Sequence, residues 1–124
     1  MQAETQAHIE TIKTAIDLLR KHVDFDAASA RLVELEEQSA DGDFWNDQAA
    51  AQEAMREKNR LQRQVTMITD LQTELDDAAG LIELGEMEGD ADVVAEAEEV
   101  IASLVTIAEK RQLESLLSLS LIHI

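Results

Sequence analysis

The sequence has 124 residues, the length of one domain, and 45% of them are hydrophobic, which is too many for a chain that is simply disordered. Its formal net charge of −17 would repel phosphates, so we expect no direct nucleic-acid binding by this segment; basic proteins are the partners that the charge allows, although an acidic surface can also be merely solvated. Cysteine is absent, the polar amino terminus is unlike a signal or transit peptide, and no run approaches the roughly 20 apolar residues of a membrane span. We therefore expect a cytoplasmic protein without membrane contact. The abundance of alanine, leucine, glutamate and glutamine, with no proline, predicts an all-α fold.

The first two predicted helices are short. The first spans residues 4–22, and its apolar residues recur at three- and four-residue steps to form one stripe: Ile9, Ile12, Ile16, Leu19 and Val23. Asp24 or Asp26 is expected to cap the second helix, which ends near Ser39. Its apolar side carries Ala28, Leu32 and Leu35. The stretch "ADGD" then predicts a turn, with Gly42 available for a positive φ.

A long third helix is predicted to begin after Trp45, with Asn46 or Asp47 as its cap, and to run to about Leu84. Its apolar positions alternate four- and three-residue steps, the spacing of a heptad seam: Leu61, Val65, Ile68, Leu75, Ala79 and Ile82, with Gln72 as the polar exception. Such a seam indicates two helices packed side by side.

The fourth predicted helix follows "GEMEGDAD", where Asp90 or Asp92 supplies the cap. Its apolar face is wide and comprises Val93, Val94, Ala97, Val100, Ile101, Leu104, Ile107 and Ala108, continued by Leu113, Leu116 and Leu117. The short connector makes the third and fourth helices, about 55 Å and about 40 Å long, antiparallel neighbours. The fourth is too short to cover the first turns of the third, so the two leading helices are expected to pack there. The prediction is a three- to four-helix bundle built around a long, coiled-coil-like antiparallel hairpin.

The aromatic pair Phe44 and Trp45 stands in the connector before the third helix. A hydrophobic residue just outside an N-cap often packs back onto the first turns of its helix. We expect Trp45 to be a buried anchor of this corner, so that its replacement by alanine costs about 3–5 kcal/mol. The alternative is an exposed aromatic pair that contacts a ligand or partner.

Metal sites and cofactors are not expected. "DGD" and "EGDAD" lack the spaced ligands of a calcium loop. Di-iron bundles use Glu-x-x-His pairs, and no histidine of this sequence has a glutamate three residues before it. The many carboxylates lie between the apolar stripe positions, as on a solvated face, and we assign no catalytic residue.

The stretch "LLRKHVDFDAASARLVELEEQSADGDFWNDQAAAQEAMREKNRL" resembles the amino-terminal region of the bacterial peptide chain release factors of type 2. The shared features are a Leu-Arg start, an Asp-aromatic-Asp step and an acidic-aromatic-Trp-Asn corner that opens a long helix. Here they fall on Leu19 and Arg20, on Asp24, Phe25 and Asp26, and on Asp43, Phe44, Trp45, Asn46 and Asp47. "DDAAGLIELGEMEGDADVVAEAEEVIASL" is similar to the next segment of that family, and the likeness covers residues 8–118. The tryptophan corner favours type 2 over type 1 factors.

The resemblance implies a role in translation termination. Type 2 release factors recognise UGA and UAA and trigger peptidyl-tRNA hydrolysis, using a Ser-Pro-Phe loop and a Gly-Gly-Gln loop. Neither tripeptide occurs in this sequence. The resemblance therefore implies a helical amino-terminal domain, residues 1–118, that is not an enzyme by itself. It would orient the factor on the ribosome, near the stalk-base proteins of the large subunit, and would be a monomer.

Residues 119–124, "LSLIHI", depart from the family, which continues into a β-rich core at this point. We expect an aberrant or truncated end here, with the Ser-Pro-Phe and Gly-Gly-Gln loops encoded further downstream; a genuine segment docking on the bundle is the alternative. The rival function is an acidic coiled-coil scaffold or oligomerisation module, because a heptad seam serves assembly between chains equally well. The short, turn-rich connector favours folding back within one chain.

Overall fold

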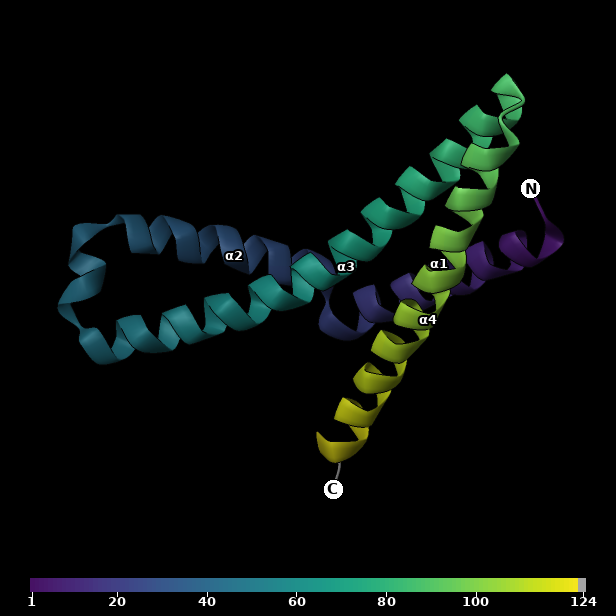
Figure 1. The fold of residues 1–124 in the computed structure, drawn as a ribbon. Helices are drawn as coiled ribbons and strands as arrows, with labels where there is room; N and C mark the ends of the chain where they lie inside the picture. The colour runs from purple at the N-terminus through teal and green to yellow at the C-terminus, as the bar shows by residue number, and fades with distance from the viewer. Residues whose placement is uncertain (123–124) are drawn as a thin grey trace.

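The computed structural model describes the backbone of residues 1–122 and the side chains of residues 1–118. Within that part, the chain forms α1 (Ala3–Val23), α2 (Phe25–Ala40), a short 3₁₀ helix η1 (Gly42–Asn46), α3 (Gln48–Glu88) and α4 (Ala91–Ile122) (Figure 1). The all-α prediction is confirmed for the described residues. The side chains of residues 119–124, where we expected an aberrant end, lie outside them.

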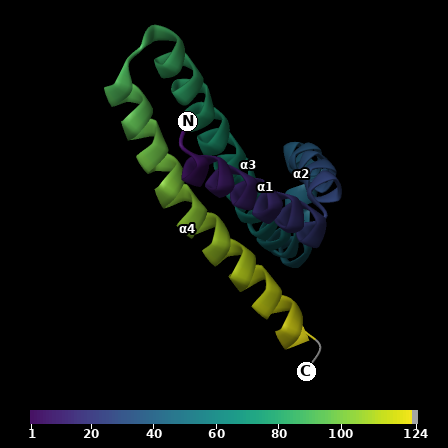
Figure 2. The same cartoon turned by 90° about the vertical axis from the view of Figure 1, so that its right-hand side faces the viewer.

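Two helical pairs share the long helix α3. In Figure 1, α2 and the first half of α3 form an arm that projects to the left, whereas the second half of α3 meets α4 at the upper right. Figure 2 shows α3 and α4 as antiparallel neighbours with α1 lying across them. Because α3 has 41 residues, it is about 60 Å long and extends beyond every helix that packs on it.

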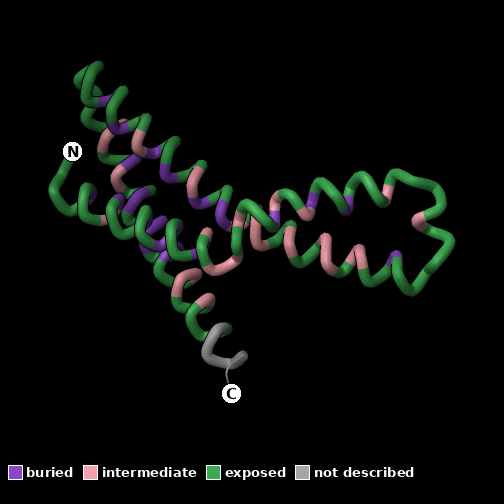
Figure 3. Tube along the Cα trace, turned by 180° about the vertical axis from the view of Figure 1, so that it is seen from behind, coloured by how far each residue is buried: buried purple, intermediate pink, exposed green. Residues whose placement is uncertain are grey.

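The main core lies where α1, the second half of α3 and α4 meet, as the buried segments in Figure 3 show. Its fully buried aliphatic side chains include Ile12, Ile16, Leu19, Ile68, Leu75, Ile82 and Ile101. The buried seam of α3 does alternate three- and four-residue steps, running through Ile68, Leu71, Leu75, Ala78, Ile82 and Gly85. Of the predicted seam, Ile68, Leu75 and Ile82 are buried, whereas Leu61, Val65 and Ala79 are only half-buried. The buried Leu71 and Ala78 each lie one residue before a predicted seam position, Gln72 and Ala79. The predicted seam assumed a single partner helix, but both α1 and α4 pack on α3. The face of α3 that is buried against these two helices is centred one residue earlier in the sequence than the predicted seam.

The arm has a small core of its own, made by Ala28, Leu32 and Leu35 of α2 with Ala51 of α3. The Arg31 guanidinium adds a bidentate ion pair across it, with Nη2 2.8 Å and Nε 3.1 Å from the two carboxylate oxygens of Glu57. The prediction that both leading helices cover the first turns of α3 was therefore half wrong. Only α2 does so, since the chain turns sharply after α1 and leaves α1 against α4.

Aspartates and one glycine set the helix ends. Asp47 Oδ1 accepts a hydrogen bond from Ala50 N–H at 3.1 Å at the start of α3, and Asp90 Oδ1 accepts from Val93 N–H at 3.2 Å at the start of α4. Gly89 ends α3 with a φ of 68°, in the left-handed region. Gly42 does not take the positive φ that was open to it, because the chain enters η1 there and turns by 3₁₀ hydrogen bonding instead.

Candidate functional site

The Asp-aromatic-Asp step at residues 24–26 forms the elbow between α1 and α2. Asp24 takes a φ of 52°; its backbone N–H donates to the Lys21 carbonyl at 3.3 Å, which closes α1. Its carboxylate accepts from Ala27 N–H at 3.4 Å, which opens α2. Phe25 packs partly buried against the main core, with the Arg20 guanidinium 4.0 Å from its ring centroid. Arg20 also reaches Asp26 at 3.7 Å, so these residues set the angle at which α2 leaves the bundle.

The acidic-aromatic-Trp-Asn corner, residues 43–47, forms the tip of the arm. Trp45 and Phe44 make an edge-to-face pair, with ring centroids 4.9 Å apart and planes at 85°. Trp45 Nε1 donates to the Ser39 carbonyl at 3.1 Å, which satisfies the indole within the tip. Asn46 Nδ2 donates to Asp43 Oδ1 at 3.4 Å.

Trp45 is 51% exposed, so the prediction of a buried anchor was wrong. The physical reason is the absence of cover: only α2 and α3 reach the tip, and the main core lies at the other end of the arm (Figure 3). Phe44 is half-buried. The ring of Trp45 borders a shallow hollow on the first turns of α3, beside Gln48, Gln52 and Met55.

The elbow and the tip do not form one site. They stand at opposite ends of α2, whose 16 residues span about 24 Å. Their hydrogen bonds close and open helices and hold side chains, which is a structural role, and nothing in this arrangement supplies a nucleophile with its base. In the part of the chain that the structure describes, no group of three or more His, Cys, Asp or Glu residues could hold a metal ion. The described helices also include none with the length and apolar character needed to cross a membrane.

Two carboxylates join elements that are distant in sequence. Hydrogen bonds from Arg31 lower the pKa of Glu57 and fix α2 to α3. The pKa of Glu98 on α4 is also lowered, because its Oε2 accepts from Gln2 N–H and from Thr5 Oγ1, each at 2.9 Å. Sequence reasoning missed both ties. Polar contacts between elements leave no periodic signal, although a threonine on the apolar side of an amphipathic helix is a hint of such a partner.

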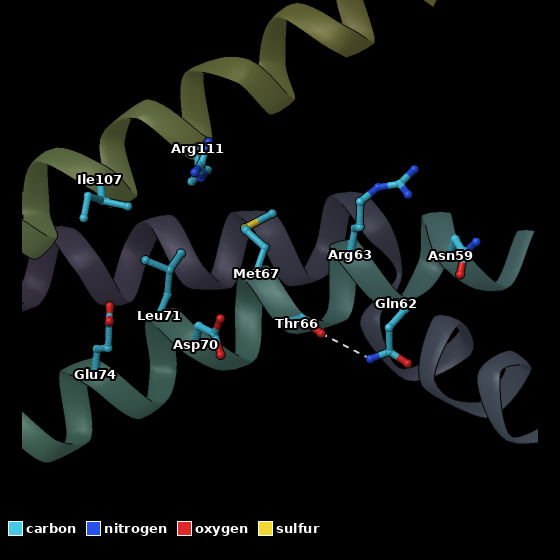
Figure 4. A pocket seen from close by; sticks show the side chains of 10 residues that line it. All are labelled: Asn59, Gln62, Arg63, Thr66, Met67, Asp70, Leu71, Glu74, Ile107 and Arg111. Carbon is cyan, nitrogen blue, oxygen red and sulfur yellow. Dashed lines mark hydrogen bonds between the residues drawn. The ribbon is translucent and has the colours of Figure 1, made fainter. Parts of the chain in front are cut away.

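The exposed side of the hairpin carries a groove between α3 and α4. The α3–α4 groove has an apolar floor of Ala78, Leu81, Ala97, Val100, Leu104 and Ile107, and an acidic rim of Glu74, Asp77, Glu96 and Glu99. Val100 and Ile107 were predicted to belong to the packed face of the fourth helix, but they remain half-exposed. The apolar face of α4 is wider than α1 and α3 together can cover. A second hollow, seen in Figure 4, shares Glu74 and Ile107 with this groove and continues along α3 to Asn59.

A comparison with protein-family models finds one match, which covers most of the chain. The model of the PCRF domain matches residues 28–122, which include most of α2 and all of η1, α3 and α4. The chain belongs to the PCRF domain family.

Several curated relatives of this chain are named peptide chain release factor 2. The chain is 45% identical over 118 residues to peptide chain release factor 2 of Paramagnetospirillum magneticum, covering 95% of this chain and 32% of that protein. The factor of the same name from Roseobacter denitrificans is 41% identical over 117 residues, covering 94% and 31%. That from Rickettsia bellii is 40% identical over 118 residues, covering 95% and 32%. The resemblance to type 2 release factors is thereby confirmed, and the chain spans about a third of the length of these relatives.

Proposed function

We propose that this PCRF domain is the amino-terminal helical domain of a type 2 peptide chain release factor and acts in translation termination at UGA and UAA. The observation that carries the proposal is the 45% identity to a release factor 2 over 95% of the chain. Residues 1–118 would form the domain. In this proposal the elbow and the tip serve as structural signatures of the family.

The domain would position the factor without performing the reaction. The sequence has neither a Gly-Gly-Gln nor a Ser-Pro-Phe tripeptide, and the elbow and tip supply capping and packing groups only. The arm and the closed end of the α3–α4 hairpin point in different directions (Figure 1), a shape suited to holding two parts of an assembly at a fixed separation.

The partners would be basic proteins of the ribosome, including those of the stalk base of the large subunit, in the cytoplasm. The net charge of −17 supports protein contacts over direct nucleic-acid contacts. A monomer is favoured because α1 and α4 of the same chain occupy the buried seam of α3. The seam is thus already used within the chain, which removes the argument for a coiled-coil scaffold.

A chimera tests the proposal. Residues 1–118 would replace the matching segment of the Paramagnetospirillum magneticum release factor 2, and peptide release would be measured on ribosomal complexes halted at UGA. We expect release close to that of the parent factor and well above that of a factor from which the segment is deleted. A folded chimera, checked by circular dichroism, that releases no faster than the deletion variant would contradict the proposal.

A further inference from the structure

We propose that the α3–α4 groove is the docking site for a basic amphipathic helix of a ribosomal protein. The ribosome as the source of that helix rests on the proposed function; the chemistry of the occupant follows from the groove itself.

The floor of the groove offers apolar surface that the fold leaves uncovered. Leu81 on α3 is 48% exposed, and Val100 and Ile107 on α4 are 49% and 44% exposed. Between them the buried Ala78 and Ala97 present only methyl groups, which hollows the surface between the two helices. Adjacent half-exposed side chains in a concave strip are typical of a binding groove, whereas single exposed aliphatic residues are ordinary.

The rim determines the charge of the occupant. Glu74 and Asp77 line one side and Glu96 and Glu99 the other, and all four side chains are exposed. Among the described residues, none of the four lies within ion-pair distance of a basic group, and no lysine or arginine lines this groove. A partner with basic side chains on both edges of an apolar face therefore fits.

The same charges disfavour the other occupants. A second copy of this chain would bring an identical acidic rim against the first, with a net charge of −17 on each molecule. A nucleic acid would set phosphates against four carboxylates and an apolar floor.

The shape of the groove favours a helix. Along α4 its lining runs from residue 96 to residue 107, about 16 Å, which is the rise of about three helical turns. A helix laid there would place apolar side chains at three- and four-residue spacing on Leu81, Val100 and Ile107, as amphipathic helices do in hydrophobic grooves. Its flanking lysines or arginines would meet the rim.

Site-specific cross-linking tests the location. The photoreactive residue p-benzoylphenylalanine would replace Ser103, which lines the groove, and in a control would replace Thr106, an exposed residue of α4 outside it. Each 124-residue chain would be irradiated with bacterial 50S subunits, and the products would be mapped by mass spectrometry. We expect the Ser103 variant to cross-link to a basic helix of a ribosomal protein, with much less product from the Thr106 variant. A Ser103 product with ribosomal RNA, or with a second copy of the chain, would overturn the inference.

Cosedimentation with 50S subunits tests the energetics. Val100→Asp places a charge on the floor and is expected to weaken binding about tenfold or more, the scale of a central interface residue. Leu113→Asp, at a more exposed position of the same helix outside the groove, should change binding less than about twofold. If the wild-type chain binds and Val100→Asp, shown folded by circular dichroism, binds equally well, the groove is not the site although the proposed function stands. If the wild-type chain does not bind 50S subunits, the proposed function itself is contradicted.

Discussion

Gly85 of α3 lies directly against Val94 of α4: a Cβ on Gly85 would be 2.8 Å from Val94 Cγ2 and 3.2 Å from Val93 Cγ1. Gly85 is buried and continues the seam of α3 into the last turn before the hairpin connector. The absence of a side chain is what lets α4 start so close to α3. The closed end of the α3–α4 hairpin is therefore tightly packed.

Gly85→Ala should destabilise the protein by about 1–2 kcal/mol, because overpacking the closed end outweighs the gain in helix propensity. Gly80→Ala is the matched control on the same helix, since a Cβ there would have no atom within 4 Å apart from the adjoining backbone and neighbouring residues of its own helix. It should stabilise the protein by about 0.5–1 kcal/mol. Urea unfolding of both variants measures the difference, and a Gly85→Ala protein as stable as Gly80→Ala would contradict the close approach.

The arm and the main core should respond differently to cavity mutations. Ile101→Ala removes a fully buried side chain of the main core and should lower the free energy of global unfolding by about 2–5 kcal/mol. Leu35→Ala empties an equally buried site in the small core of the arm, where α2 and α3 lack a third helix. We expect it to speed amide exchange mainly in α2 and the first turns of α3 by local opening. Equal acceleration across α1 and α4 would show that arm and core unfold as one unit.

Sequence periodicity predicted the helices well because the spacing of apolar residues and the capping residues that mark a helix lie within the same short stretch of chain. The first predicted helix, residues 4–22, matches α1 to within one residue at each end, and the aspartate caps of α3 and α4 were correctly placed among the alternatives. An aspartate before an amphipathic segment carries the capping signal within a few residues of chain. Such local signals need no knowledge of the fold.

The errors concern which neighbour covers which residue. Trp45 looks like an anchor by composition, but its burial depends on whether a third helix reaches the tip, and none does. Val100 and Ile107 belong to an apolar face whose width exceeds the cover available, which no single-helix pattern can reveal. The α3–α4 groove could not be predicted from the sequence for the same reason, because its two sides come from different helices.

Replacing Trp45 should now cost less than the range for a buried aromatic. With half of its surface exposed and one hydrogen bond to Ser39, Trp45→Ala is expected to lower stability by about 1–2 kcal/mol, compared with about 3–5 kcal/mol for a fully buried ring. Trp45→Phe keeps a ring beside Phe44 but loses the N–H donor, so it should show part of that loss. Urea unfolding measures both. Because Trp45 is the single tryptophan, its fluorescence in the folded protein should also be readily quenched by acrylamide. Fluorescence that acrylamide does not quench, together with a loss of unfolding free energy above about 3 kcal/mol in Trp45→Ala, would restore the anchor hypothesis.

The tie between Glu98 and the start of α1 should make the stability of that region depend on pH. Hydrogen bonds from Gln2 N–H and Thr5 Oγ1 lower the pKa of Glu98, so the folded state favours the carboxylate more than the unfolded state does. The stabilisation is therefore fully present above the ordinary pKa of 4.5 and is lost as the pH falls through the lower pKa of the folded protein. Glu98→Gln should remove this contribution and flatten the pH dependence of protection in the first turn of α1, measured by amide exchange at several pH values.

Thr5→Val and Thr5→Ser separate the hydroxyl from the burial of this residue. Thr5→Val deletes one donor and should move the pKa of Glu98, followed by carboxyl NMR, back toward its ordinary value, whereas Thr5→Ser keeps the donor and should leave it low. The Gln2 amide remains in both variants, so the return in Thr5→Val should be partial. Identical Glu98 titrations in the two variants would mean that the Thr5 hydroxyl does not hold the carboxylate, and that the amino-terminal turn is fixed to α4 by packing and the Gln2 amide alone.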